Sequence, residues 1–475
     1  MLFTFQTILL AVTFLVLQTE GSPLPRRALA VTLPLKRAQS TQRGLHPQIQ
    51  LQQRMNRAHS RLARMTGRAP PTDLEMRNNL HRRMLALEEG NALSKRYNRI
   101  GVPKQNPESQ PAAGKGFNEL AAGSSLSSLG VEKANAPTAA NSLGLDIQGD
   151  DLGYLATIKL GTPPRDFLIL MDSGSADFWV GAENCQGDQG GNCGRHNFLG
   201  PKSSKTFVDS GSPFTVTYGT GKISGDVITD TVNIAGLSLL NHTFGVATVE
   251  SIEFTGSTTP FDGLMGLAQS ALSQEGVPTP VESLASAGLI PAPITSYKIA
   301  READNKNDGE ITFGALDPAK FKQNTLITLA NVNTLGFWEA NLDAILVDGK
   351  DTGLAGRTAI LDTGTTLIVA PAADAAAVHA LIPGAQSDGQ GGFTIPCTTD
   401  ASVALEFGGS DFAIDTRDLA LQPVDLADPS GQCVSGITSG TIGGDKEWLV
   451  GDVFLKNAYF STNVAQNTLS LAKLA

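Results

Sequence analysis

Two short segments of the chain, at residues 169–175 and 359–365, have nearly the same sequence. In each, an apolar stretch ends at an aspartate, Asp172 or Asp362, followed by a hydroxyl residue, a glycine and a second hydroxyl residue. A buried carboxylate is costly unless it is hydrogen-bonded or used in chemistry. Two carboxyl groups about 3 Å apart share one proton, so that one acts as a base and the other as an acid. Such a pair is suited to amide hydrolysis, which needs an activated water and a proton donor.

The residues after each aspartate fit that chemistry. Gly174 and Gly364 leave room for backbone N–H groups and a substrate to approach the carboxylates. Ser175 and Thr365 are placed to hydrogen-bond the carboxylate oxygens. A single Asp–hydroxyl–Gly sequence would indicate only a turn, so the argument depends on finding two copies.

The similarity extends beyond these segments. Gly266 follows Asp172 by 94 positions and Gly451 follows Asp362 by 89, each after two apolar residues. Two such agreements predict an internal duplication of one lobe. We place the boundary between the lobes near residue 320.

Charge is divided unevenly along the 475 residues. Residues 1–140 hold 19 basic and 8 acidic side chains, and residues 141–475 hold 17 and 38. A basic arm could bind nucleic acid, or it could fold onto the acidic body of its own chain. We favour the second interpretation and expect no nucleic-acid partner.

The basic part has its own pattern. The apolar run 8–17 and the small residues after it predict a signal peptide at residues 1–21, and we expect no membrane anchor. Residues 22–138 form a basic segment and linker. Within it, two stripes at helical spacing predict a basic amphipathic helix, one apolar (Leu51, Met55, Ala58, Leu62, Met65) and one basic (Arg54, Arg57, Arg61, Arg64, Arg68). The alternative is a solvated helix or a short coiled coil.

From Gly153 the pattern changes to short strands. Residues 154–160 alternate, 161–164 form a turn, and 167–171 are continuously apolar. Helices are predicted only at 281–287 and 372–381. The abundant glycine, 50 residues, also favours an all-β structure.

Four cysteines behind a signal peptide imply two disulfides, with three possible connectivities. The near pairs, Cys185–Cys193 and Cys397–Cys433, are the simplest choice. Their spacing is not that of a zinc site, and we expect no metal and no cofactor. Asn241 begins a glycosylation sequon.

Six segments together resemble one family: 172–175, 362–365, 178–180, 218–221, 261–267 and 450–454. Through them, residues 150–475 are similar to pepsin-like aspartic endopeptidases of the secreted or vacuolar fungal type. The resemblance implies an all-β, bilobal fold of two duplicated β-barrel-like lobes with a central cleft, preceded by a partly helical propeptide. It also supports the near-pair disulfides.

The resemblance implies roles for further residues. Tyr218 becomes the flap tyrosine, bonded to Trp179, and the substrate-binding set is Gly174, Ser175, Tyr218, Gly219, Thr220, Gly364, Thr365 and Thr366. Thr220 replaces an acidic residue that attracts lysine in some relatives, so we expect large apolar residues around the cut bond. The basic segment becomes an inhibitory propeptide released by acid, with Lys95 and Tyr97 at the catalytic pair and Arg96 as the alternative.

These inferences predict an N-terminal lobe at 139–320 and a C-terminal lobe at 321–475. We expect a monomeric, secreted endopeptidase of proteins and peptides, with a vacuolar location as the alternative. Two other classes are a glycosidase, which also uses two carboxylates, and an inactive peptide-binding relative. The tandem loops and the flap argue against the first, and the intact Asp172 and Asp362 against the second.

Overall fold

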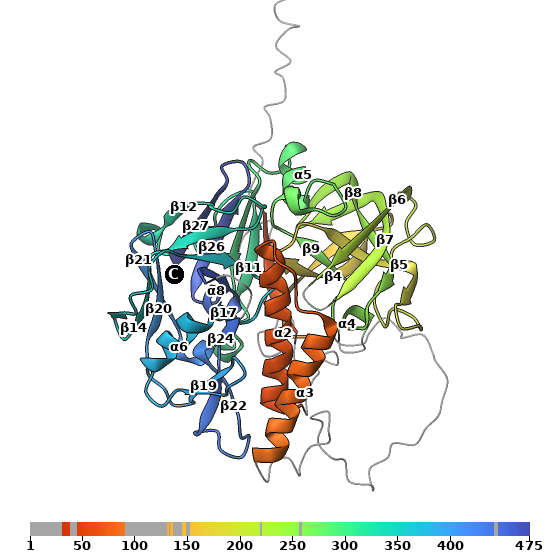
Figure 1. The fold of residues 1–475 in the computed structure, drawn as a ribbon. Helices are drawn as coiled ribbons and strands as arrows, with labels where there is room; N and C mark the ends of the chain where they lie inside the picture. The colour runs from red at the N-terminus through yellow and green to blue at the C-terminus, as the bar shows by residue number, and fades with distance from the viewer. Residues whose placement is uncertain are drawn as a thin grey trace, which may run out of the picture.

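The computed structural model describes residues 31–38, 45–90, 131–132, 134–135, 145–148, 153–218, 221–255, 259–440 and 445–475. The predicted signal peptide, most of the linker, Lys95 to Tyr97, Gly219 and Thr220 lie outside these residues. The described chain is mainly β-structure in two lobes, with two helices between them (Figure 1).

The largest sheet has 14 strands and runs through both lobes. Its order is β12-β27-β26-β10-β11-β1-β2-β3-β4-β9-β5-β8-β7-β6. The strands on the N-terminal side are β3 (Gly153–Leu160), β4 (Arg165–Asp172), β5 (Phe178–Gly187), β6 (Val208–Thr217), β7 (Lys222–Ile234), β8 (Leu237–Glu250) and β9 (Gly263–Gly266). The remaining strands are β1 (Val31–Ala38), β2 (Leu145–Gln148), β10 (Ile294–Lys298), β11 (Gly309–Phe313), β12 (Ile327–Ala330), β26 (Ala458–Asn463) and β27 (Thr468–Lys473).

Three smaller sheets form the rest of the C-terminal side, in the orders β13-β16-β25-β17-β24, β15-β14-β20-β21 and β18-β19-β23-β22. Their strands are β13 (Glu339–Leu342), β14 (Ala344–Val347), β15 (Lys350–Asp351), β16 (Arg357–Leu361), β17 (Ile368–Pro371), β18 (Gln386–Ser387), β19 (Phe393–Pro396), β20 (Val403–Phe407), β21 (Ser410–Ile414), β22 (Ala420–Pro423), β23 (Gln432–Ser435), β24 (Ile437–Gly440) and β25 (Glu447–Val450).

The internal duplication predicted from the sequence is present in the strand pairing. Strand β4 pairs in parallel with β9, so that Asp172 lies opposite Gly266. Strand β16 pairs in parallel with β25, and their last pair, Leu361 and Val450, immediately precedes Asp362 and Gly451. In each lobe the second strand of this pair also runs antiparallel to a third, β5 or β17. Both aspartates therefore stand at the same point of a repeated three-strand unit.

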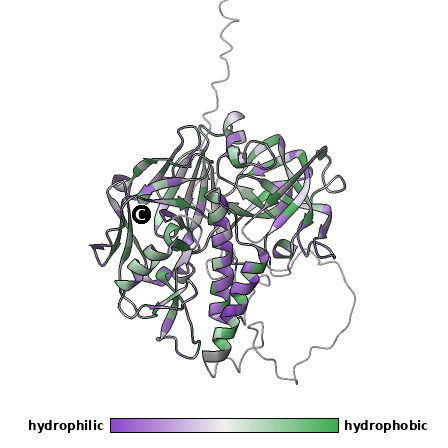
Figure 2. Ribbon diagram, viewed as in Figure 1, coloured by the Kyte–Doolittle hydropathy of each residue, from purple (hydrophilic) through white to green (hydrophobic). Residues whose placement is uncertain are grey.

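The two long helices are α2 (Pro47–Met65) and α3 (Asp73–Gly90), and we call them the helical hairpin. Pro47 stands in the first turn of α2, where its missing N–H costs nothing. Helix α2 ends at Met65 with Thr66 as its C-cap residue, and Gly67 follows with a φ of 67°. Hydrophilic residues predominate along α2, which lies between the strands of the two lobes (Figure 2).

The other helices are short: α4 (Ile252–Thr255), α5 (Pro280–Ser286), α6 (Ala372–Ala380), α7 (Thr416–Leu419) and α8 (Asp452–Leu455). Helices α5 and α6 confirm the two predicted helices. Helix α5 begins with a capping box. The Thr279 side chain accepts from the backbone amide of Glu282, and the Glu282 side chain accepts from the backbone amide of Thr279. Helix α3 was not predicted from the sequence, because its apolar residues have no clear helical stripe.

Candidate active site

Asp172 and Asp362 meet between the lobes, and both side chains are fully buried. The residues after them bond crosswise. The Ser173 amide donates to Thr363 Oγ1, and the Thr363 amide donates to Ser173 Oγ, each at 2.9 Å. Ser173 Oγ in turn donates to the carbonyl of Leu361 at 3.2 Å, and Thr363 Oγ1 donates to the carbonyl of Met171 at 3.0 Å. This lattice joins the two lobes directly beneath the carboxylates.

Each carboxylate has the same two internal donors. Asp172 Oδ1 accepts from the Gly174 amide at 2.9 Å, and its Oδ2 accepts from Ser175 Oγ at 2.6 Å. Asp362 Oδ1 accepts from the Gly364 amide at 2.9 Å, and its Oδ2 accepts from Thr365 Oγ1 at 2.5 Å. These bonds fix the orientation of both groups, and those from Thr365 and Gly364 lower the pKa of Asp362 against the effect of its burial.

A side chain from the helical hairpin lies on this pair. Arg61 of α2 donates Nε to Asp362 Oδ2 at 2.6 Å and Nη2 to Asp362 Oδ1 at 3.0 Å, and the same Nη2 bonds Asp172 Oδ1. A Cβ added at Gly174 or Gly364 would meet this guanidinium and the opposite carboxylate. Glycine is therefore required at both positions for a cation, or any other group, to reach the pair.

The ionisation of the site reflects burial and charge together. Burial raises the pKa of Asp362, the Arg61 charge opposes that rise, and the neighbouring Asp172 adds to it. Burial by itself would lower the pKa of Arg61, but the two carboxylates outweigh it and raise that pKa. Arg61 thus stabilises negative charge on a pair that would otherwise hold a proton.

Tyr218, the flap tyrosine predicted from the sequence, lies beside Trp179 in the first lobe. Trp179 Nε1 donates to the Tyr218 hydroxyl at 2.7 Å, and the Phe254 ring packs edge-on against both rings. Burial, with the nearby carboxylates Asp177, Glu275 and Asp172, raises the pKa of Tyr218 well above its ordinary value. Tyr218 therefore stays a neutral phenol with a hydroxyl proton to donate.

Helix α2 lies between the strands of the two lobes (Figure 1), and its apolar stripe packs on the C-terminal side. The five residues of its predicted apolar stripe are all buried, between 0 and 4% exposed. One end of the stripe packs with Leu367 and Val434, and the other packs with Phe337, Ile360 and Leu449. Between them His59 bonds the carbonyl of Ser439 at 2.9 Å.

Arginines extend the contact on both sides of Arg61. Arg64 donates to the carbonyl of Thr217, at the end of strand β6. Arg68, just after α2, pairs with Glu447 at 3.3 Å. Arg83 of α3 pairs with Asp388, and in that pair the arginine side chain is 1% exposed and the aspartate 10%. The predicted docking of the basic segment on acidic groups of the body is therefore present in the structure.

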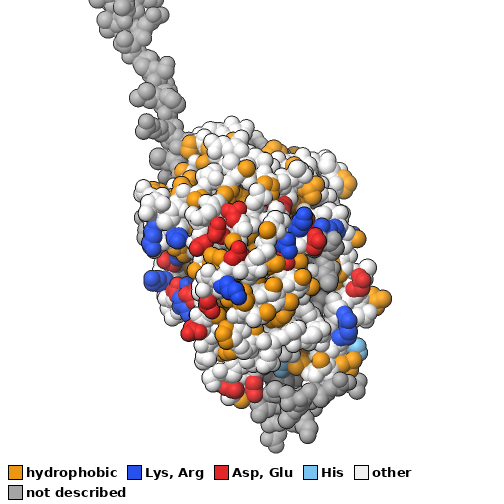
Figure 3. All heavy atoms as spheres, turned by 60° about the vertical axis from the view of Figure 1, so that its left-hand side comes forward, with side chains coloured by type: hydrophobic (Ala, Val, Ile, Leu, Met, Phe, Trp, Pro, Cys, Tyr) orange, Lys and Arg blue, Asp and Glu red, His pale blue; other side chains and the backbone are white. Residues whose placement is uncertain are grey.

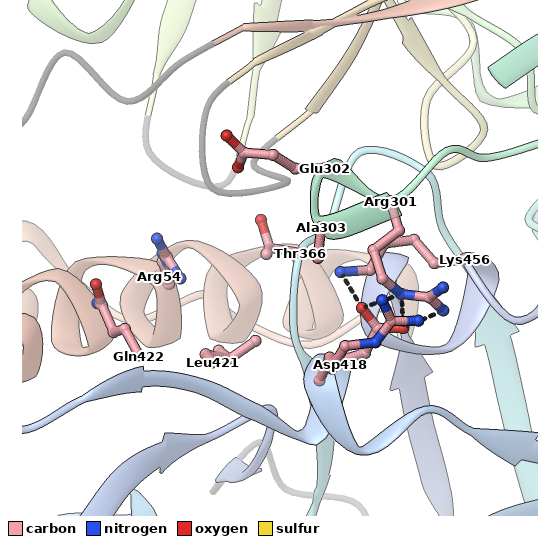
Figure 4. Close-up of a pocket in the computed structure, with 10 residues that line it drawn as sticks. Arg54, Arg301, Glu302, Ala303, Thr366, Asp418, Leu421, Gln422 and Lys456 are labelled. Atoms are coloured by element: carbon pink, nitrogen blue, oxygen red, sulfur yellow. Dashed lines mark hydrogen bonds and ion pairs between the residues drawn. The ribbon is translucent and has the colours of Figure 1, made fainter. Parts of the chain in front are cut away.

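A pocket remains beside α2 on the C-terminal side (Figure 4). Arg54 of α2 and Thr366, from the second active-site loop, are among its lining residues. Its deepest charged group is Asp418, 1% exposed, which pairs with Arg301 at 2.6 Å and with Lys456 at 2.7 Å. Arg301 and Lys456 are thus already paired within the protein. Lys and Arg also lie among Asp and Glu on the face shown in Figure 3.

Other predicted features have definite positions. Both near-pair disulfides, Cys185–Cys193 and Cys397–Cys433, are present. Asn241 is exposed. Within the described part of the chain, one group of possible metal ligands occurs, formed by the Cys185–Cys193 disulfide and Glu250, and its sulfurs are not free thiolates. Each helix among the described residues is too short or too polar to cross a bilayer.

Arg61 is the central member of the basic stripe, but its sequence does not distinguish it from the other four arginines. Its selection depends on which turn of α2 reaches the carboxylates, and spacing along the helix does not reveal that. Asp388 was also missed, because nothing in its local sequence distinguishes it from a turn residue. The predicted inhibitory residues, Lys95 and Tyr97, lie outside the described chain, so their role stays a prediction.

The fold and the site together are those of a bilobal aspartic protease. The model of the family described as "Eukaryotic aspartyl protease" matches residues 153–474. The chain belongs to this family.

Curated relatives agree with that assignment. A "Probable aspartic-type endopeptidase CTSD" of Arthroderma benhamiae is 36% identical over 340 residues, 71% of this chain and 64% of the relative. "Rhizopuspepsin" of Rhizopus chinensis is 34% identical, covering 69% of this chain and 80% of the relative. "Cathepsin D" of Dictyostelium discoideum is 30% identical, covering 66% and 80%. The chain thus spans less than two thirds of the length of the Arthroderma protein.

Proposed function

We propose that this protein is an aspartic endopeptidase that hydrolyses peptide bonds at acid pH, with Asp172 and Asp362 as its catalytic pair. The observation that carries the proposal is the convergence of these two buried carboxylates, each held by a glycine amide and a hydroxyl. Family membership gives independent support.

In the proposed mechanism a water lies between the two carboxyl groups. The ionised carboxylate takes a proton from that water as it attacks the peptide carbonyl, and the protonated partner donates to the carbonyl oxygen. The proton then passes to the leaving nitrogen as the intermediate collapses. Burial and mutual repulsion keep one proton on the pair, and the Ser173–Thr363 lattice keeps the geometry fixed.

The surroundings of the pair support a preference for apolar side chains next to the cut bond. The part of α2 that flanks Arg61 places Leu62 and Met65 in an apolar cluster with Phe337 and Leu449. These contacts occupy space that a substrate would take after the helix leaves. Closure of the flap through Tyr218 and Trp179 would exclude water from the reaction.

We also propose that the chain is made as an inactive precursor, in which the helical hairpin is the inhibitory segment and Arg61 the residue that blocks the pair. Arg61 bonds three of the four carboxylate oxygens of the pair and so takes the position of the water and the substrate. Acid would weaken this contact by protonating the carboxylates. Secretion fits the two disulfides and the predicted signal peptide, with the vacuole as the alternative.

The test uses the full-length precursor, incubated in acid and then assayed with casein and with pepstatin, whose hydroxyl mimics the tetrahedral intermediate. We expect cleavage that pepstatin abolishes, and no cleavage by Asp172→Asn or Asp362→Asn. The two variants keep the size of the side chain, so a folded but inactive product is expected. Pepstatin-insensitive cleavage, or full activity in either variant, would refute the proposal.

A further inference from the structure

The turn between β18 and β19, residues 388–392, lies against the helical hairpin at a distance from the catalytic pair. A Cβ on Gly391 would meet Met55 of α2 and Ser439, and one on Gly392 would meet Leu51. The turn is tied to β24, since Ser439 donates both its amide and its hydroxyl to the Gly391 carbonyl, at 2.8 and 3.0 Å. It is therefore a fixed part of the wall that α2 covers.

Asp388 is held in one orientation by this turn. Its Oδ1 accepts from the amides of Gln390 at 2.8 Å and Gly392 at 2.9 Å. Gly389 and Gly391 have φ values of 69° and 88°, which few residues other than glycine adopt easily. A Cβ at Gly392 would collide with the Asp388 carboxylate. The backbone thus directs one oxygen inward and leaves Oδ2 for an outside partner.

That partner is a guanidinium. Arg83 Nη1 donates to Asp388 Oδ2, while Arg83 Nε and Nη2 donate to Gln52 Oε1 at 3.1 and 3.0 Å. Of the side chains that bond Arg83, Gln52 and Met55 belong to the hairpin, and Asp388 belongs to the body. When the hairpin leaves, the body retains a preoriented carboxylate that has lost its cation.

We propose that Asp388 is a specificity-determining residue, which binds a basic side chain of the substrate at a subsite distant from the cut bond. The proposal rests on the proposed function, because it requires that α2 lies where the substrate binds. An arginine is favoured over a lysine, since its planar donors suit a carboxylate. The hairpin would then inhibit by filling two subsites with arginines, Arg61 at the catalytic pair and Arg83 at Asp388.

The helix gives the approximate position of this subsite. Met55 and Leu51 precede Arg61 by six and ten residues, which at about 1.5 Å per residue is about 9–15 Å along α2. An extended peptide advances about 3.3 Å per residue. The basic side chain therefore belongs about three to five residues from the cut bond, on one side only.

The experiment measures kcat and KM of the activated enzyme on one quenched fluorescent peptide with an apolar pair at its centre. Arginine replaces glutamine at each of positions three to five on either side, at about pH 5, where free aspartate is largely ionised. We expect one position on one side to raise kcat/KM by about 5- to 30-fold, mainly through KM, since the contact is made before and during the reaction.

Two variants separate a binding role from a structural one. In Asp388→Asn the turn keeps its acceptor for Gln390 and Gly392, and the ratio of arginine to glutamine peptide should fall to about one. In Asp388→Lys a glutamate peptide should become the better substrate at the same position. Glu447→Gln removes the carboxylate that pairs with Arg68 on the other side of Arg61, and should leave the ratio at the Asp388 position unchanged.

The outcomes are distinguishable. If the wild-type enzyme cuts the glutamine peptide but arginine gives no gain at any position, or if the gain persists in Asp388→Asn, the subsite assignment is wrong and the endopeptidase proposal stands. If the acid-treated enzyme cuts neither casein nor any of the peptides, both proposals fall.

Discussion

Replacing Arg61 by glutamine tests the central contact of the precursor. Glutamine keeps much of the length of the side chain and can still donate a hydrogen bond, but it carries no charge. The substitution leaves Asp172 and Asp362 beneath the helix with no cation between them, and both are fully buried. The apolar stripe of α2 and the Arg83 pair remain, so the helical hairpin should still dock, more weakly.

The size of the effect follows from the geometry. Arg61 is 14% exposed and contacts both carboxylates. Removing one partner of such a buried pair costs about 3–5 kcal/mol, and each 1.4 kcal/mol is a factor of about ten in an equilibrium constant. The open form of the precursor should therefore become about 100-fold to a few thousand-fold more populated near neutral pH. Arg61→Lys keeps the charge on a single ammonium group. The population of its open form should lie between those of the wild type and Arg61→Gln.

The assay is cleavage of a quenched fluorescent peptide by freshly purified precursor, with mass spectrometry to verify that the chain is intact. Arg61→Gln should cut the peptide near neutral pH, where the wild-type precursor is inert. The matched control is Arg77→Gln on α3, because Arg77 is exposed and the change removes the same charge from the same hairpin. Activity in the control equal to that of Arg61→Gln would refute the specific role of the contact.

The pH dependence gives a second readout of the same reasoning. In the closed precursor the Arg61 charge opposes protonation of Asp362, whose pKa burial and Asp172 raise. The open form therefore binds more protons than the closed form, and opening becomes more favourable as pH falls. The rate of activation of the wild type should rise steeply with acid, and that of Arg61→Gln should depend on pH less. If the activation rates of the two proteins changed equally with pH, the proposed link between opening and protonation of the pair would be wrong.

Two further substitutions test the Ser173–Thr363 lattice and a buried carboxyl group of the first lobe. Thr363→Val removes the acceptor of the Ser173 amide and the donor to the Met171 carbonyl, so denaturant unfolding should show a loss of about 2–4 kcal/mol, whereas Thr363→Ser should restore most of it. Glu250→Gln addresses a carboxyl whose pKa burial and then Asp262 raise to about 8. Because that pKa lies above the unfolded value, the stability it contributes is fully present at low pH and is lost as pH rises. The free energy of unfolding of the variant, measured by thermal unfolding, should match that of the wild type at pH 4 and exceed it by up to about 3 kcal/mol at pH 7. The same difference in free energy at both pH values would exclude the carboxyl group as its cause.

The sequence alone predicted the features that depend on patterns of neighbouring or regularly spaced residues. The twin segments around Asp172 and Asp362 revealed the site because an apolar run ending in a carboxylate is unusual and a repeated one more so. The alternating and continuous apolar runs located β3 and β4, and the stripes at helical spacing located α2. The spacing of Gly266 and Gly451 predicted the duplication, since parallel pairing places each opposite or beside its aspartate.

What could not be predicted depends on contacts between distant parts of the chain. Arg61 is one of five arginines at equivalent spacing, and only the packing of Leu62 and Met65 against the second lobe determines which one reaches the carboxylates. Asp388 acquires its importance from Arg83, 305 residues away in the sequence. Helix α3 has little amphipathic pattern of its own and is held by its contacts with α2, such as that between Asn56 and the Met76 carbonyl.

The helical form of the segment in the cleft explains how it could inhibit without being cut. The carbonyls inside α2 accept hydrogen bonds from the amides four residues later and lie close to the helix axis, so they are not presented to the catalytic pair as an extended substrate's would be. The group that reaches the pair is the Arg61 side chain, which holds no peptide bond. An isolated helix of this length is marginal in water and depends on its contacts. Under the proposed activation, acid would remove the ion pairs of Arg61 and Arg83, and the hairpin would leave as an extended chain, which is the form an endopeptidase cleaves.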